Sequence, residues 1–300
     1  MEELIDVPAG LHNVAVTDTV IGDVRGDEGF YHYRQYDATD LARTAAFEDV
    51  WHLFENGALP SDDQRERFRA GIAALRTVPT ELHDLVDVVA RIDDAPLAKL
   101  RTVLSASAGP TDVRPMLDVS PAQRVVDARR LAAMVPAILA RLYRCAAGSA
   151  IVVPDRSLGH AAAYLHEVTG VVPRPEHARA LEQYLILTID HGFNASTFTG
   201  RVVASTGASI VDVVCAAIGA LAGPLHGGAP SRALDALDAI GTPDRAADWV
   251  RGELTAGRRI MGFGHAVYRT PDPRSSLLRE VARQLGGELV ERAMAIESEI

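Results

Sequence analysis

The spacing of apolar and polar residues changes once along the chain, close to residue 40. Residues 11–36 alternate short apolar runs with Gly and Asp, a pattern that is typical of short strands joined by tight turns. We therefore expect one or two β-hairpins in this segment, turning at Gly22-Asp23 and at Gly26-Asp27. From Asp40 onward, apolar residues recur three and four positions apart, which predicts helices.

Polar residues and prolines divide the rest of the chain into helical segments. Asp40, Ser61 and Thr80 are expected N-caps, because each precedes a segment with helical periodicity. Further helices are expected over the following ranges: 120–147, 177–192, 195–206, 209–222, 231–240, 245–256, 273–286 and 288–300. No convincing strand follows the hairpin region, so the predicted fold class is all-α with a short N-terminal β-hairpin.

The character of the predicted helices changes near residue 225. Segments 195–206 and 209–222 carry almost no charge, which is typical of helices deep in a core or at a subunit interface. Beyond the glycine-rich turn the helices are shorter and more charged. We expect a large helical domain over 1–222, which includes the hairpin, and a smaller helical domain over 223–300, with the glycines as a hinge.

Composition and charge narrow the class of protein. The net charge of −10 argues against a nucleic-acid surface, so an anionic ligand would need a local arginine pocket. The N-terminus lacks the basic and apolar regions of a signal peptide, and no apolar stretch is long enough for a bilayer. Cys145 and Cys215 show no metal-type spacing. We expect a soluble, cytoplasmic protein with reduced cysteines and no nucleic-acid or membrane partner.

Three of the ten histidines stand beside glycine in turns: His191 in TIDHGFNAST, His226 in GPLHGGAP and His265 in IMGFGHAVYRTPDPR. Glycine lets the backbone approach a ligand closely. Arg269 and Arg274 follow His265, and the prolines around Arg274 stiffen a loop that suits bidentate binding of a carboxylate or phosphate. Taken singly, these residues could instead belong to a surface loop with a salt bridge to Asp272. The separations between the histidines match no short zinc motif, so we expect no metal.

The stretches DHGFNAST, AAIGALAGPLHGGAP and IMGFGHAVYRTPDPR closely resemble the signature segments of the citrate synthase family, which includes 2-methylcitrate synthases. They stand in the family's order, and the GFYHYRQYDATDLA segment resembles the family's N-terminal region. The resemblance covers essentially the whole chain. It implies a homodimeric acyltransferase that condenses acetyl-CoA with oxaloacetate and releases citrate and CoA, with no permanently bound cofactor.

The resemblance also implies a role for each motif residue. His226 would donate a hydrogen bond to the thioester carbonyl, and His265 would bond the ketone of oxaloacetate and protonate the new hydroxyl. His191 and Arg274 would bind oxaloacetate, and Asn194 would orient His226 or its neighbours. Four residues would bind the acyl-CoA. Arg269 would bind a phosphate of CoA, and the backbone of Gly262, Phe263 and Gly264 would lie against its adenine.

The surroundings of His226 agree with this role on physical grounds. Pro230 predicts that a helix begins directly after His226, and a helix N-terminus disfavours a positively charged imidazole. We therefore expect a neutral ring, which can donate a hydrogen bond to a developing enolate. The neighbouring glycines are expected to leave room for the acyl group.

The chain departs from the family in one important respect. In the family the catalytic base is an aspartate or glutamate well beyond the GFGH motif, whereas this sequence ends at Ile300. Asp272 and Glu297 are the only nearby carboxylates that we consider as substitutes. We therefore expect a C-terminally truncated chain with an incomplete small domain, whose activity is severely reduced or absent.

Three other functions are open on the sequence alone. The chain could be a 2-methylcitrate synthase that uses propionyl-CoA. It could be a non-catalytic relative that binds CoA or a partner. It could also be a related lyase that cleaves citryl-CoA.

Overall fold

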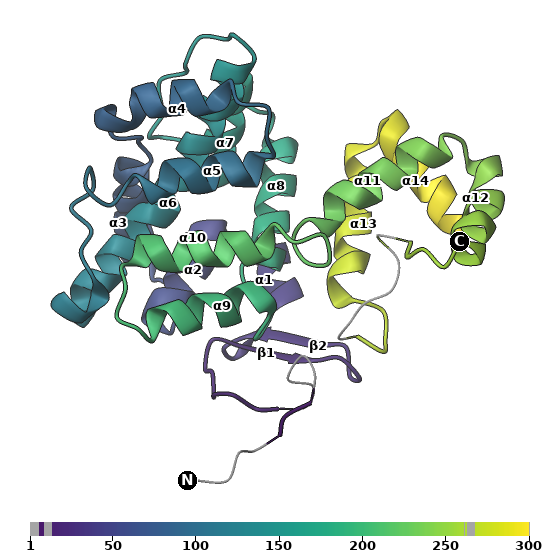
Figure 1. The fold of residues 1–300 in the computed structure, drawn as a ribbon, viewed down its shortest axis with the longest axis horizontal. Coiled ribbons are helices and arrows are strands. Elements are labelled where there is room, and N and C mark those ends of the chain that lie inside the picture. The colour runs from purple at the N-terminus through teal and green to yellow at the C-terminus, as the bar shows by residue number, and fades with distance from the viewer. Residues whose placement is uncertain (1–5, 9–13, 261, 263–267, 300) are drawn as a thin grey trace.

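The computed structural model describes residues 6–8, 14–260, 262 and 268–299. Within them the chain forms fourteen α-helices and one small sheet (Figure 1). The predicted fold class, all-α with a short N-terminal hairpin, is therefore confirmed.

The sheet is an antiparallel hairpin with a short third strand. Strand β1 (Gly22–Arg25) pairs with β2 (Phe30–Tyr33), and β3 (Tyr36–Asp37) pairs with the end of β2. The turn predicted at Gly26-Asp27 is confirmed, because it connects the two longer strands. The turn predicted at Gly22-Asp23 is wrong, since Gly22 opens β1 opposite Tyr33. Gly22 packs closely on Asp190, because a Cβ on it would lie 2.5 Å from Oδ2 of that side chain, which would have to move.

The helices follow the order of the predicted segments, with most ends within two residues of the expected position. They are α1 (Ala38–Thr44), α2 (Phe47–Asn56), α3 (Asp62–Leu75), α4 (His83–Ala90), α5 (Pro96–Ser105), α6 (Pro121–Ala146), α7 (His160–Thr169), α8 (Pro175–Thr188), α9 (Ala195–Ala204), α10 (Ile210–Leu221), α11 (Ala229–Ile240), α12 (Ala246–Thr255), α13 (Pro273–Leu285) and α14 (Glu288–Glu299).

Only one of the three expected N-caps is confirmed. Ser61 caps α3 by accepting the N–H of Gln64. Asp40 lies inside the first turn of α1, because Asp37 is the capping side chain. Thr80 starts a short 3-10 helix and makes no capping hydrogen bond to its backbone.

Two large apolar clusters and one small cluster hold the helices together. The first contains the hairpin tyrosines, α1 and α2, and it also receives Leu277 and Val281 from α13. The second forms around α4, α5 and α6. The third joins Ile240, Ala246 and Ile296 in the group formed by α11, α12 and α14. Because α13 packs its apolar side against the first cluster, it connects this outer group to the rest of the molecule.

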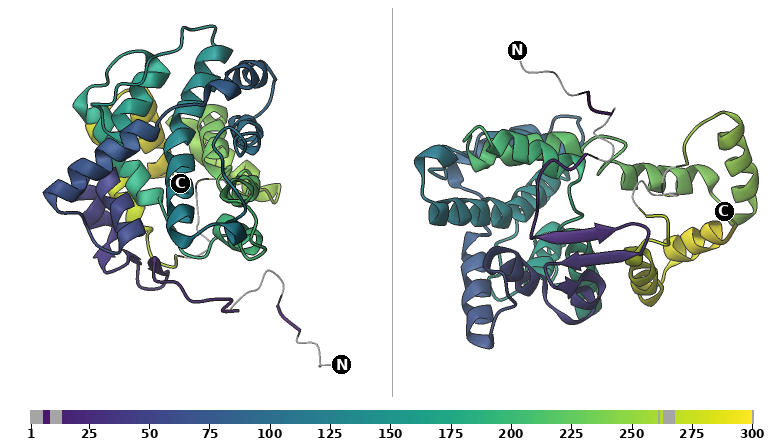
Figure 2. Two further views of the ribbon diagram at one scale, coloured as in Figure 1. Left: turned by 90° about the vertical axis from the view of Figure 1, so that its left-hand side faces the viewer. Right: turned by 90° about the horizontal axis from the view of Figure 1, so that it is seen from below.

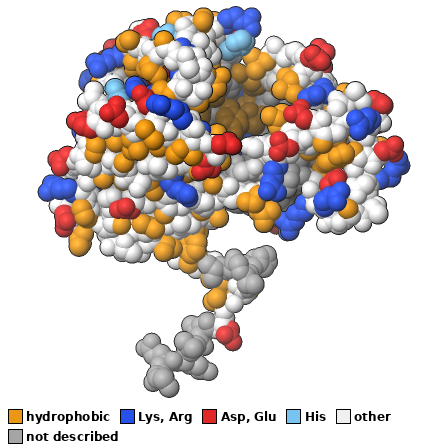
Figure 3. All heavy atoms as spheres, turned by 45° about the horizontal axis from the view of Figure 1, so that its top comes forward, with side chains coloured by type: hydrophobic (Ala, Val, Ile, Leu, Met, Phe, Trp, Pro, Cys, Tyr) orange, Lys and Arg blue, Asp and Glu red, His pale blue; other side chains and the backbone are white. Residues whose placement is uncertain are grey.

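The outer group stands apart from the main body on one side of the molecule (Figures 1 and 2). The surface is hollowed between the two parts, and hydrophobic side chains line the floor of the hollow (Figure 3). The division into domains at residues 222 and 223 stays a prediction. Among the described residues, none of the helices has both the length and the apolar character required to cross a membrane.

Candidate active site

His226 lies in a tight turn between α10 and α11. Its backbone N–H donates to Gly223 O at 3.0 Å, and its carbonyl accepts the N–H of Ala229 at 3.0 Å. The turn depends on the glycines, because a Cβ on Gly227 would lie 2.8 Å from the backbone oxygen of Leu221. The glycines next to His226 thus let the chain pack against the end of α10.

The ring of His226 is held by the first turn of α9. Ser196 Oγ lies 2.9 Å from Nε2 of His226 and 2.7 Å from Oδ1 of Asn194. Asn194 is also the N-cap of α9, since Oδ1 accepts the N–H groups of Ser196 and Thr197. Asn194 therefore reaches His226 through Ser196.

His191 lies in the turn between α8 and α9, between two tyrosine rings. Its Nε2 lies 3.1 Å from the hydroxyl of Tyr268, and its ring centroid is 5.2 Å from that of Tyr31. Burial is the main cause of the raised pKa of Tyr268, about 12, so its hydroxyl stays protonated near neutral pH. His191 is therefore oriented by two aromatic side chains that are distant in sequence.

Arg274 lies in the first turn of α13, half-buried beside Asp272. Two guanidinium nitrogens contact the carboxylate, with Nη2 2.6 Å from Oδ2 and Nε 3.0 Å from Oδ1. Burial opposes the charge of Arg274, but hydrogen bonds and the negative charge of Asp272 outweigh it and raise the pKa. The guanidinium carbon also lies 5.7 Å from the centroid of the Tyr31 ring. The structure thus brings His191 and Arg274 to the same aromatic ring.

The remaining predicted residues, His265 for the ketone of oxaloacetate and four residues for CoA, fall only partly in the described chain. His265, Phe263 and Gly264 lie outside the described residues. Gly262 has a positive φ of 96°, and a Cβ on it would lie 3.1 Å from Cβ of Ala233 in α11. Arg269 has an exposed side chain, and its backbone N–H donates to Gly26 O of the hairpin at 3.0 Å.

Three residues of this region were not identified from the sequence: Tyr31, Ser196 and Tyr268. Ser196 carried a weak signal, because it stands two residues after Asn194 at the start of a helix. Tyr31 and Tyr268 carried none, since their contacts with His191 join segments far apart in the chain. Within the described residues, no group of three or more His, Cys, Asp or Glu side chains could hold a metal ion.

Comparisons with known proteins agree with the site and the fold. The family described as "Citrate synthase, C-terminal domain" matches residues 10–300. Citrate synthase of Haloferax volcanii is 35% identical over 302 residues, which cover 98% of this chain and 80% of the relative. A 2-methylcitrate synthase of Mycobacterium tuberculosis is 37% identical over 288 residues, which cover 95% of this chain and 72% of the relative.

Solved structures give the same result. The crystal structure of citrate synthase from Thermotoga maritima is 30% identical and has a TM-score of 0.85, covering 97% of this chain and 77% of its own. The Thermoplasma acidophilum citrate synthase, solved as a ternary complex with carboxymethyl coenzyme A and oxaloacetate, is 27% identical and has a TM-score of 0.91. The match covers 98% of this chain and 77% of that chain.

The fold and the sequence similarity together define an enzyme of the transferase class. The chain belongs to the citrate synthase family.

Proposed function

We propose that this chain serves the condensation of acetyl-CoA with oxaloacetate to give citrate and CoA. In this reaction His191 and Arg274 hold oxaloacetate, and His226 polarises the thioester. The observation that carries the proposal is the hydrogen bond between Ser196 and His226, because it leaves a defined ring nitrogen for the substrate.

The chemistry at His226 follows from this hydrogen bond. The Ser196 hydroxyl donates to Oδ1 of Asn194. When it donates instead to Nε2 of His226, a neutral imidazole carries its proton on Nδ1. Among the described residues, Nδ1 of His226 makes no hydrogen bond, so the Nδ1–H group can donate to the thioester oxygen. A donor aimed at this oxygen stabilises the negative charge that develops in the enolate.

Oxaloacetate carries two carboxylates and needs cationic or donor partners for both. Arg274 supplies a guanidinium that Asp272 and the start of α13 hold in place. His191 supplies an imidazole that Tyr268 orients. His265 remains proposed as the partner of the ketone. Arg269, Gly262, Phe263 and Gly264 remain proposed as the contacts of the acyl-CoA.

The two carboxylates considered as substitute bases are both paired with arginines. Asp272 bonds Arg274 with both oxygens. Glu297 is exposed on α14 and bonds Arg279 of α13. A carboxylate paired with an arginine is a weaker base, since the nearby positive charge stabilises its ionised form. Both carboxylates are therefore weak candidates for the catalytic base.

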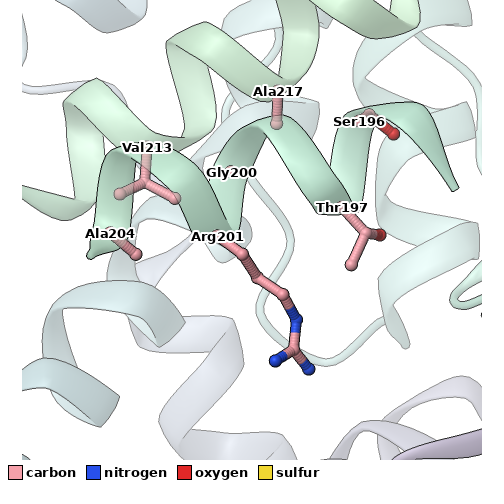
Figure 4. A pocket seen from close by; sticks show the side chains of 7 residues that line it. All are labelled: Ser196, Thr197, Gly200, Arg201, Ala204, Val213 and Ala217. Atoms are coloured by element: carbon pink, nitrogen blue, oxygen red, sulfur yellow. The ribbon is translucent and has the colours of Figure 1, made fainter. Parts of the chain in front are cut away.

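The proposal includes a homodimer built on α9 and α10. A groove of about 310 Å³ runs along these helices, and Figure 4 shows the side chains that line it. Most of its lining is small or apolar, including Gly200, Ala204 and Val213. Val202 of α9 and Leu117 nearby are also exposed apolar side chains, at 50% and 78%. An exposed apolar surface of this kind supports a subunit interface.

The experiment that tests the function measures free CoA thiol released from acetyl-CoA, with the 300-residue chain at a concentration near that of the substrate. We expect slow release that requires oxaloacetate and is lost in a His226→Ala variant. Release of CoA that does not require oxaloacetate, or that continues in the His226→Ala variant, would contradict the proposal. A parallel assay with propionyl-CoA decides between citrate synthase and 2-methylcitrate synthase, and we expect acetyl-CoA to react faster.

A further inference from the structure

Tyr31 is a buried side chain of the N-terminal hairpin that lies next to the candidate site. It is 1% exposed, and its hydroxyl lies 2.7 Å from that of Tyr33 and 3.0 Å from Leu187 O. It also contacts the carbonyl oxygen of Asp190. These carbonyls lie in and just after the last turn of α8, where a helix has no partners of its own for such groups. The hydroxyl therefore holds the backbone directly before His191.

The ring of Tyr31 contacts the two side chains that the proposed function assigns to oxaloacetate. The His191 ring is tilted by 59° to it at a centroid distance of 5.2 Å. The guanidinium carbon of Arg274 lies 5.7 Å from the same centroid, within the range of a cation–π contact. One rigid ring thus touches both an imidazole from the α8–α9 turn and a guanidinium from α13.

The rest of the hairpin supports the same two segments. Gly22 packs on Asp190, as described above. At the hairpin turn, Gly26 O accepts the backbone N–H of Arg269 at 3.0 Å and the hydroxyl of Thr270 at 3.2 Å. The views in Figures 1 and 2 agree that the hairpin lies beside the loop that leads into α13. The hairpin therefore joins the turn that carries His191 to the segment that carries Arg274.

We propose that Tyr31 is a positioning residue for oxaloacetate, and that its ring sets the relative placement of His191 and Arg274. This inference rests on the proposed function, since it takes oxaloacetate as the ligand of these two residues. The ring has only two side-chain torsions, and both ends of it are held, so it is a stiff spacer. A flexible aliphatic side chain at position 31 would leave the imidazole and the guanidinium less well placed.

The test compares two variants at position 31 with a matched control. Tyr31→Leu removes the ring, and Tyr31→Phe keeps the ring but removes the hydroxyl. Phe47→Leu is the control, because Phe47 is a buried aromatic residue of the same apolar cluster whose ring contacts Trp51 and His160. Oxaloacetate and CoA affinities are measured separately by calorimetry on the folded 300-residue chain.

We expect Tyr31→Leu to weaken oxaloacetate binding about tenfold and to leave CoA binding unchanged, since a misplaced pair of side chains affects only the dicarboxylate. Tyr31→Phe should bind oxaloacetate with an affinity between those of the parent chain and Tyr31→Leu, because the ring contacts remain while the hydroxyl's bond to the backbone before His191 is lost. Equal binding by the parent and Tyr31→Leu would overturn the inference. An equal loss in Phe47→Leu would also overturn it, because the effect would then be general destabilisation.

A second readout separates this inference from the proposed function. The ring-proton NMR signals of His191, assigned with a His191→Asn variant, should shift in Tyr31→Leu and stay in place in Phe47→Leu. Failure of the parent chain to bind oxaloacetate would defeat the proposed function, and with it oxaloacetate as the ligand of the two positioned side chains. Unchanged His191 signals in Tyr31→Leu would defeat the positioning role.

Discussion

The hydroxyl oxygen of Ser196 lies 2.9 Å from Nε2 of His226. The same oxygen lies 2.7 Å from Oδ1 of Asn194, which already accepts two backbone N–H groups. Serine has one hydroxyl proton, so it can donate to only one of these two acceptors. Donation to His226 places the imidazole proton on Nδ1, whereas donation to Asn194 requires His226 to carry its proton on Nε2. Ser196 thereby controls the tautomer on which the proposed chemistry depends.

Replacing Ser196 with Ala should change the tautomer of His226. We expect the Nε2–H form to increase in ¹⁵N NMR spectra and oxaloacetate-dependent CoA release to fall about tenfold or more, because the donor to the thioester is lost. Thr199→Ala is the matched control on the same helix, since within the part of the chain that the structure describes the Thr199 hydroxyl bonds only Ala195 O. A Ser196→Ala chain with the parent tautomer and rate would refute the assignment.

Asn194 should be important for stability as well as for Ser196. Its Oδ1 caps α9, and loss of such a cap costs about 1 kcal/mol. Asn194→Ala is therefore expected to lower the free energy of unfolding by about 1 kcal/mol in urea titrations. Asn194→Asp keeps a capping oxygen and should stay close to the parent. If the Ala variant were as stable as the Asp variant, the capping role would be wrong.

The turn at His226 should not tolerate a side chain at position 227. A Cβ there would lie 2.8 Å from Leu221 O and 2.3 Å from Cδ1 of Leu221. Gly227→Ala should therefore lower the thermal midpoint and move His226 away from Ser196. Gly252→Ala is the control in the middle of α12, where a Cβ meets no atom within 4 Å among the described residues. It should stabilise the chain by about 0.5–1 kcal/mol, and equal effects at both positions would contradict the account.

Two buried groups should make stability depend on pH in opposite directions. Burial lowers the pKa of His160 to about 4, and the charge of Arg76 contributes. The unfolded chain therefore binds more protons than the folded chain between pH 6.5 and 4, so stability falls as pH falls. Burial raises the pKa of Glu167 to about 7, against the smaller effect of Arg76. The folded chain binds more protons between pH 4.5 and 7, so this group adds stability as pH falls through that range.

Single variants separate these two effects. When the pH falls from 7 to 5, His160 should lower the free energy of unfolding by about 2 kcal/mol, and Glu167 should raise it by about 1–2 kcal/mol. The stability of the parent chain should therefore change little. His160→Gln should become more stable at pH 5 than at pH 7, and Glu167→Gln should become less stable. Urea unfolding at both pH values measures this, with the exposed His177→Gln as control. Parallel pH profiles for all three variants would show that neither group titrates as described.

The sequence predicted most of the helices because their apolar residues recur at helical spacing. Helix α7 was missed, since its N-cap is Gly159, which has no side chain that could mark the start of the helix. The Asp40 cap was misplaced because Asp37, three residues earlier, is an equally good capping residue. Local pattern is therefore a good guide to the presence of helices and a weaker guide to their ends.

The three motif histidines and Arg274 could be selected because glycine or proline stands directly beside each of them. Tyr31 could not, since its importance comes from contacts with His191 and Arg274, which lie far along the chain. Ser196 could not be assigned to His226 either, because the hydrogen bond joins the start of α9 to the turn after α10. Such contacts depend on the packed fold.

The central claim is that His191 and Arg274 bind oxaloacetate, and calorimetric titration of oxaloacetate into the parent chain and Arg274→Ala tests it most directly. Arg279→Ala is the control, because Arg279 is a partly exposed arginine of the same helix that pairs with Glu297. We expect saturable binding to the parent and to Arg279→Ala, and at least about tenfold weaker binding to Arg274→Ala, since a charged hydrogen bond contributes about 1.5–3 kcal/mol. No binding to the parent, or equal binding to Arg274→Ala, would contradict the account.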